Sequence, residues 1–253
     1  MTELIARRDN PPAPLRPAPL AMAVLLSFVA GYLDSYTYLS LFGLFAAQVT
    51  GSFVIAGAEF VTSDFGIAGK LLAIAAFLVA AAATAALILS AGEARRATLP
   101  WMLALEALLL AIFAAIVVFG PAVRDARDWH GIVAGIFAAM AMGAQSVAVR
   151  LLMKDIPQTN VMTGNMTQLG IAVTELLMTR RRFAENPRGD AANRAVAQVR
   201  GRLVTVLSIA VGFLTGAASG AVAFATTGLT GALAAVAIVA ALALWALARQ
   251  HRG

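Results

Sequence analysis

The feature that most constrains this chain is a series of long apolar stretches that carry few charges. They lie at 20–41, 70–91, 101–119, 131–152, 203–223 and 229–248. A helix of roughly 20 apolar residues crosses the hydrocarbon of a membrane. Only 13% of the 253 residues are charged and 60% are hydrophobic, whereas about a quarter of a soluble domain is charged. The sequence therefore predicts an all-α polytopic membrane protein and excludes a soluble or disordered one.

Two further stretches, 50–62 and 163–178, have a helical pattern but are too short to span a membrane comfortably. Each follows a partly polar link, at 42–49 and at 154–161. Pro157 in the second link disfavours helical geometry at Ile156. We expect two short broken or re-entrant helices, which gives six transmembrane helices. Full crossing by both short helices, which gives eight spans, is the alternative.

The distribution of basic residues predicts the orientation. In the six-span arrangement, 16 of the 19 Lys and Arg residues lie on the side of both termini, and in the eight-span arrangement 15 do. Cytoplasmic loops are rich in Lys and Arg, so both arrangements place the termini in the cytoplasm. We expect a proline-rich disordered tail over 1–19, a single transmembrane domain over 20–248, and an arginine-rich cytoplasmic loop over 180–202.

Residues typical of catalysis or metal binding are scarce. Cysteine is absent, and the two histidines, His130 and His251, lie outside the apolar stretches. The chain has no glycine-rich phosphate loop of the Walker type and only one aspartate within an apolar stretch. The sequence therefore predicts no enzyme, no cofactor, no metal site and no nucleic-acid partner. Membrane lipid and a small solute are the expected partners, and a homo-oligomer is left open.

The two halves of the chain resemble each other. Gly31-Tyr-Leu-Asp34 is followed by Thr50-Gly51-Ser52, and Gly143-Ala-Gln145-Ser146 is followed by Thr163-Gly164-Asn165. The small residues Ala76, Ala80 and Thr84 correspond to Gly212, Gly216 and Gly220, a pattern that lets helices pack closely in lipid. We expect an internal repeat over 20–119 and 131–248. With three spans in each half the repeat is inverted, and the Thr-Gly elements meet near the midplane.

These motifs, above all Gly143-Ala-Gln-Ser and Val161-Met-Thr-Gly-Asn-Met-Thr167, resemble the YoaK-like family of bacterial inner-membrane proteins of unknown function. The resemblance covers about 20–248 and implies a multi-pass protein of the inner membrane. It implies no activity. Ser52 departs from the pattern, because asparagine is expected there by analogy with Asn165, which puts a role for two symmetrical amides in doubt.

Asp34 is a candidate functional residue because a charge deep in an apolar span costs roughly 2.5–3.5 kcal/mol on insertion scales. It lies about 21 Å along a helix that starts at Leu20. Ser27, Gly31 and Tyr38 share its helical stripe. Two interpretations are open. Asp34 caps the N–H groups of a neighbouring short helix, or it forms a site for a proton, a cation or a substrate.

The two Thr-Gly helix starts are the other candidate site. The free N–H groups and the positive end of a helix dipole favour anions and carboxylates. The candidate substrate-binding residues are Asp34, Tyr38, Gln48, Thr50, Gly51, Ser52, Gln145, Ser146, Asn160, Thr163, Gly164 and Asn165. Their polar groups either hold the broken helices together or line a water-filled cavity.

The favoured hypothesis is a secondary transporter or channel for a small polar or anionic solute. In the alternative, the protein is a non-transporting membrane sensor or a structural or assembly component, and its polar centre is purely structural. A hydrated cavity that includes both helix starts would favour the first hypothesis.

Cysteine labelling tests the topology, because the chain has no native cysteine. Arg95→Cys and Lys154→Cys report on the 92–100 loop and on the second link. In the six-span arrangement both positions are cytoplasmic, so an impermeant maleimide added to intact cells leaves both unlabelled. Labelling of both from outside would instead establish eight spans.

Overall fold

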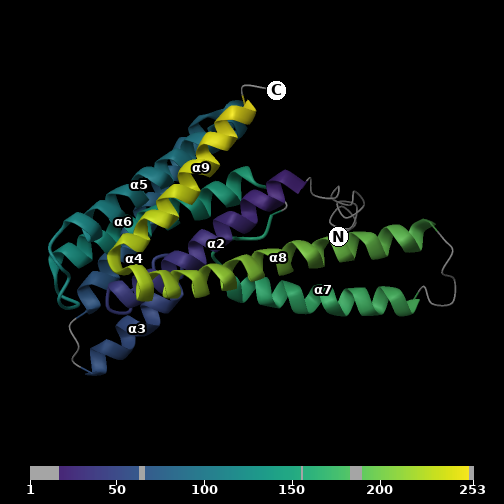
Figure 1. Ribbon diagram of the computed structural model, residues 1–253. Helices are drawn as coiled ribbons and strands as arrows, with labels where there is room; N and C mark the ends of the chain where they lie inside the picture. Colours follow the sequence, from purple (N-terminus) through teal and green to yellow (C-terminus); the bar gives the residue numbers. More distant parts are fainter. Residues whose placement is uncertain (1–16, 63–65, 155, 183–189, 251–253) are drawn as a thin grey trace.

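The structure is a computed structural model that describes residues 17–62, 66–154, 156–182 and 190–250. The secondary structure of these residues is entirely helical (Figure 1). The elements are α2 (Pro17–Ser40), α3 (Val49–Thr62), α4 (Ile67–Ser90), η1 (Gly92–Thr98), α5 (Leu99–Phe119), α6 (Trp129–Leu152), α7 (Met162–Arg182), α8 (Asp190–Thr227), η2 (Gly228–Gly231) and α9 (Ala232–Gln250). Most of the expected tail at 1–19 lies outside the described residues. Its last three residues are already helical, since proline is tolerated in the first turn.

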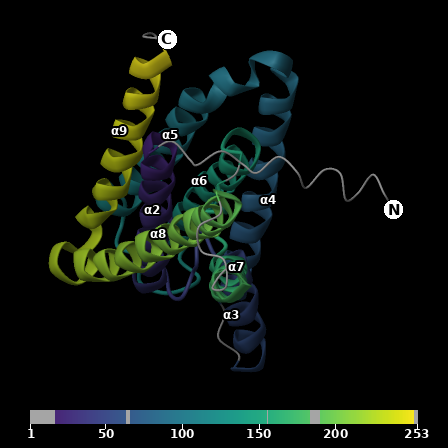
Figure 2. The same ribbon diagram turned by 90° about the vertical axis from the view of Figure 1, so that its right-hand side faces the viewer.

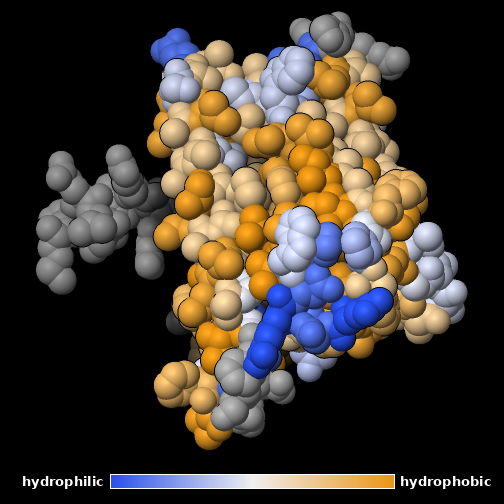
Figure 3. Space-filling view, turned by 90° about the vertical axis from the view of Figure 1, so that its left-hand side faces the viewer, coloured by the Kyte–Doolittle hydropathy of each residue, from blue (hydrophilic) through white to orange (hydrophobic). Residues whose placement is uncertain are grey.

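Five helical stretches are long and apolar enough to cross a membrane. They are Ala18–Ser40, Ile67–Ser90, Gly92–Phe119, Trp129–Leu152 and Asn193–Gln250. Five rather than six stretches result because η2 joins α8 to α9 in one continuous helical run. Large apolar side chains such as Leu78, Phe119 and Leu244 are exposed, and one face is mostly apolar around a hydrophilic patch (Figure 3). These features confirm an all-helical protein with the surface of a membrane protein.

The first helix of each half of the chain packs against a helix of the other half. The first helix of the first half, α2, packs against α8, and the first helix of the second half, α6, packs against α4. The last helices, α5 and α9, contact each other, and the short helices α3 and α7 lie against α4 and α8, respectively (Figures 1 and 2). The long helices of one half of the chain therefore all contact long helices of the other half.

Glycines bring these helices into backbone contact. A Cβ atom on Gly31 would lie 2.1 Å from the carbonyl oxygen of Phe213, and one on Gly143 would lie 2.5 Å from that of Phe77. The predicted ridge of Gly212, Gly216 and Gly220 packs against the carbonyls of Val24, Phe28 and Tyr32, one turn apart on α2. Such close approach permits dispersion contacts and Cα–H···O bonds that any side chain would prevent.

The first link turns the chain back into the bundle. Phe42 and Gly43 have positive φ angles (52° and 79°), and α3 then begins beside Asp34 of α2. The ammonium of Lys70, at the start of α4, donates to the carbonyl of Phe42 (3.0 Å) and pairs with Glu59 late in α3 (2.7 Å). The end of α2, the end of α3 and the start of α4 therefore lie at the same end of the bundle.

The second short helix is longer than expected. The predicted short helix at 163–178 is observed as α7, which continues to Arg182, and α8 begins at Asp190. The expected loop over 180–202 is therefore largely helical, apart from 183–189, which lies outside the described residues. Ala, Arg and Gln, which are strong helix formers, explain this difference. Arg202 of α8 pairs with Glu175 of α7 (3.1 Å), and the two helices form a hairpin that extends away from the bundle (Figure 1).

Two glycines of α8 offer a matched test of the close packing. We expect Gly216→Ala to lower the free energy of unfolding by about 1–3 kcal/mol, because the new Cβ would lie 2.0 Å from the carbonyl oxygen of Phe28. Gly201→Ala has open space and should raise stability by up to about 1 kcal/mol. Denaturation in detergent micelles measures both, and equal effects would contradict the close approach of α2 and α8.

Candidate functional site

A cavity of about 450 Å³ lies where the two links meet α4. Residues of both short-helix starts line it, together with one face of α4. The lining residues are Ala47, Gln48, Val49, Thr50, Phe53, Ile74, Phe77, Leu78, Ser146, Asn160, Val161, Met162 and Thr163. Two regions more than 100 residues apart in the sequence, one from each half, thus face the same space.

The predicted site residues divide into those that line this cavity and those that do not. Gln48, Thr50, Ser146, Asn160 and Thr163 line it. Outside the lining are Asp34, Tyr38, Gly51, Ser52, Gln145, Gly164 and Asn165. Tyr38 departs most from the prediction that it binds a substrate, since it is 43% exposed and packs on the ring of Phe45. The cavity is therefore built from fewer polar groups than the sequence motifs contain.

Asp34 holds the first link in place. Asp34 is 3% exposed, and its Oδ1 atom accepts hydrogen bonds from the backbone N–H groups of Ala47 (2.7 Å) and Gln48 (3.2 Å). Both of these residues line the cavity, so Asp34 lies directly behind its wall. Asp34 therefore binds the last two residues of the link, whereas the capping interpretation expected it to bind the first N–H groups of the short helix, which begins at Val49. The second oxygen, Oδ2, has no hydrogen-bond partner among the described residues.

The second link is held by polar groups of two helices. Gln145 of α6 donates through Nε2 to the hydroxyl of Thr159 (2.9 Å) and to the carbonyl of Leu26 (3.1 Å). Ser27 of α2 donates to the carbonyl of Thr159 (2.8 Å). The hydroxyl of Ser146 lies 3.5 Å from the side-chain oxygens of Gln158 and Asn160. The link is thus fixed to α2 and α6 at once.

Ser52 and Asn165 perform equivalent tasks in the two halves despite their different chemistry. The hydroxyl of Ser52 accepts from the N–H of Phe45 (3.2 Å) and donates to its carbonyl (2.9 Å). The amide of Asn165 donates to the carbonyl of Gln158 (2.7 Å). In both cases, the first turn of the short helix binds the backbone seven residues earlier. The serine at position 52 therefore preserves the function of the asparagine that the motif led us to expect.

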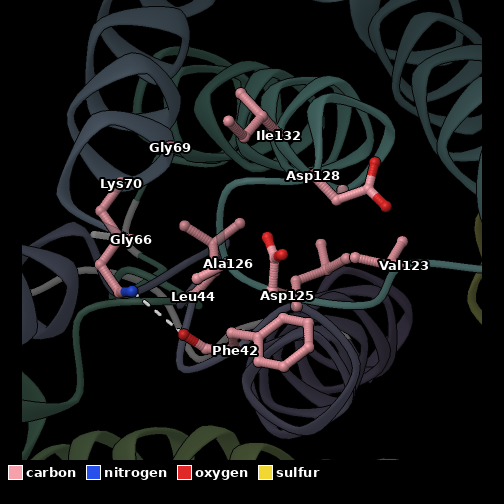
Figure 4. A pocket seen from close by; sticks show the side chains of 12 residues that line it. Phe42, Leu44, Gly66, Gly69, Lys70, Val123, Asp125, Ala126, Asp128 and Ile132 are labelled. Carbon is pink, nitrogen blue, oxygen red and sulfur yellow. Dashed lines mark hydrogen bonds between the residues drawn. The ribbon is translucent and has the colours of Figure 1, made fainter. Parts of the chain in front are cut away.

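A small second pocket, of about 20 Å³, lies at the end of the bundle where α4 begins. Figure 4 shows Asp125 pointing into it, with Lys70 bonded to the carbonyl of Phe42. Asp128 caps α6 by accepting from the N–H of His130 (3.0 Å), and this bond lowers the pKa of Asp128. The space accommodates no more than a water molecule or two, so this pocket is structural.

Two buried charged groups were not among the predicted site residues. Lys70 is 2% exposed, and its hydrogen bond to Phe42 and its ion pair with Glu59 give it a structural role. Glu106 of α5 is 1% exposed, and neither of its oxygens has a hydrogen-bond partner among the described residues. Glu106 could have been singled out from the sequence, because it is a carboxyl group within the apolar stretch 101–119. Neither residue lines the large cavity.

The chemistry of the large cavity is that of non-covalent recognition. None of its lining side chains is charged, and five carry hydroxyl or amide groups. Among the described residues, no cluster of three potential His, Cys, Asp or Glu metal ligands occurs. The arrangement can bind a small molecule through hydrogen bonds from neutral side chains beside two helix starts.

The comparison with protein families gives one match. A family model described as a protein of unknown function, DUF1275, matches residues 22–246. This match confirms the YoaK-like resemblance, because YoaK-like proteins are members of that family. No curated protein and no solved structure matches the chain.

Two substitutions of Asp34 separate hydrogen bonding from charge. Asp34→Ala should lower the free energy of unfolding by about 1–3 kcal/mol, because the buried N–H groups of Ala47 and Gln48 lose their acceptor. Asp34→Asn keeps an acceptor oxygen and should cost much less. Chemical denaturation of both variants in detergent measures the difference, and equal losses would show that the carboxylate charge is what the fold needs.

Proposed function

Because the chain belongs to DUF1275, a family of unknown function, its activity must be argued from the site, and we propose that it is a permease or channel for a small polar or anionic solute. The observation that carries the proposal is the single cavity that the starts of α3 and α7 share. Broken helices whose ends converge on one space are the usual construction of solute sites in membrane transporters.

The arrangement of α3 supports re-entry rather than crossing. If α3 crossed the membrane, its end and the end of α2 would lie on opposite faces. Instead, Lys70 contacts both Phe42, just after α2, and Glu59, late in α3. With 14 residues, α3 is about 21 Å long and begins inside the bundle beside Asp34. The first half then has three spans, formed by α2, α4 and α5.

Equivalent contacts in the two halves support an inverted repeat of three plus three spans. Gly31 meets the carbonyl of Phe213 as Gly143 meets that of Phe77. Phe77 and Phe213 each directly follow the first residue of the small-residue ridge of their own half, Ala76 or Gly212. With an odd number of spans in each half, the second half is oriented opposite to the first, so α3 and α7 enter the bundle from opposite faces.

The surroundings of the cavity support a polar or anionic solute in the cytoplasmic membrane. No acidic side chain lines the cavity, and the starts of two helices, each the positive end of a dipole, border it. The excess of Lys and Arg on the side of the termini supports a cytoplasmic position for both termini. We therefore include an inner-membrane location with cytoplasmic termini in the proposal.

One observation favours the alternative of a non-transporting sensor or assembly component. Asp34, Ser52, Gln145 and Asn165 all make hydrogen bonds that hold the links. In this alternative, the polar centre only satisfies the backbone where the helices are broken. The two functions differ in whether water and a solute enter the cavity.

Thiol labelling in proteoliposomes tests for that water. Thr163→Cys places a thiol in the cavity lining, and Val54→Cys, at a site 67% exposed on apolar α3, serves as the lipid-facing control. The anionic, water-soluble thiosulfonate MTSES reacts with thiolates, which form in water but not in hydrocarbon. We expect Thr163→Cys to react at least about tenfold faster than Val54→Cys.

Slow reaction at both positions would remove the hydrated cavity and leave the structural alternative. If Thr163→Cys reacts, a screen of solutes for increased thermal stability identifies the ligand, because ligands that bind the native state stabilise it. Uptake of that solute into proteoliposomes then separates transport from sensing.

A further inference from the structure

We infer that the cavity takes an amphiphile, a molecule with a small uncharged polar head and an apolar tail, which enters sideways from the membrane. The inference rests on the proposed function and deepens it by naming the class of substrate. Three properties of the cavity support it. Its wall is partly polar and partly apolar, its rim is exposed, and the N–H groups of the first link already donate to Asp34.

The wall of the cavity is divided between polar and apolar surface. Its hydroxyl and amide groups come from the links, the two helix starts and, through Ser146, α6, whereas α4 contributes only Ile74, Phe77 and Leu78. Asn160 is among the most buried lining residues, at 3% exposed. A wholly polar solute would lose water against the α4 wall and gain no partner there. A molecule with both a polar and an apolar end matches both parts of the wall.

The rim of the cavity is exposed and also has two kinds of surface. Phe53, Leu78 and Val161, which line the cavity, are 55%, 68% and 46% exposed. Leu78 lies at the middle of α4, a helix of membrane-spanning length, so this part of the rim faces hydrocarbon. On α7, the exposed residues Thr163 and Thr167 continue a polar face away from the cavity. The tail of an amphiphile can approach past α4 while its head stays beside α7.

The first link offers little to a charged head. The N–H groups of Ala47 and Gln48 already donate to Asp34. No cationic side chain lines the cavity, so an anionic head would find only the two helix dipoles as counter-charge. The carboxyl group of Asp34 lies behind the start of α3 and weakens that one. Neutral hydrogen bonds to Gln48, Ser146 and Asn160 suit an uncharged head such as a glycerol or an amide.

Protection of the cavity thiol tests the inference. Thr163→Cys in proteoliposomes is labelled with MTSES in the presence of either monodecanoylglycerol or glycerol, which have the same head with and without a tail. We expect monodecanoylglycerol to slow labelling about fivefold, as occupancy of about four-fifths of the cavities would give, and glycerol to have no effect. Thr174→Cys, exposed on the same helix but outside the cavity, should be unaffected by both.

A rim variant adds a second readout. Leu78→Ser changes an exposed side chain, so the protein should still fold. Protection in this variant is measured against its own labelling rate of Thr163→Cys without amphiphile. Protection by monodecanoylglycerol should decrease. Undiminished protection in this variant would overturn the apolar route past α4.

The remaining outcomes separate this inference from the proposed function. Labelling that neither compound slows, or that glycerol slows equally, overturns the amphiphile and leaves the hydrated cavity of the proposed function intact. Absence of labelling overturns the proposed function itself. Oxidation of Phe53→Cys to a disulfide-linked dimer, unchanged when the protein is diluted with lipid, would show that a second copy covers the rim, and it would also overturn the inference.

Discussion

The constraint on which this structure depends is the need to pair backbone polar groups where two helices are interrupted inside an apolar bundle. Water cannot satisfy those groups in hydrocarbon, so side chains must. Asp34 and Ser52 do this for the first link, and Gln145 and Asn165 do it for the second. Several polar side chains of the centre are therefore committed to the fold, and five others line the cavity.

Close backbone packing makes this arrangement possible. Glycines at the α2–α8 and α4–α6 crossings bring the helices near enough for short side chains to reach a link on a neighbouring element. Ser27, for example, reaches both the second link and the carbonyl of Ile209 on α8. The small residues at the α2–α8 crossing thus assist the polar contacts made beside it.

Much of the fold could be predicted because it depends on local patterns. The lengths of the apolar stretches predicted the long helices, and the Thr-Gly motifs predicted the starts of α3 and α7 to within one residue. The cavity was harder to predict, because hydroxyl and amide residues look alike whether they line a space or bind a backbone. Tyr38 and Asn165 were expected at one site, yet the ring of Tyr38 packs at a tilt on Phe45, and Asn165 is buried in the first turn of α7, where it binds the second link. Which of these roles a side chain has depends on distant contacts such as that of Gln145 with Leu26.

The attachment of Thr159 has a mechanical consequence. This residue belongs to the second half of the chain, yet Ser27 of the first half binds its carbonyl while Gln145 of the second half binds its hydroxyl. Any displacement of the second link must therefore either break these bonds or carry α2 along. Thr159 thus adds a polar connection between the two halves to the close contacts of α2 with α8 and of α4 with α6, so a movement of the second link is also felt by α2.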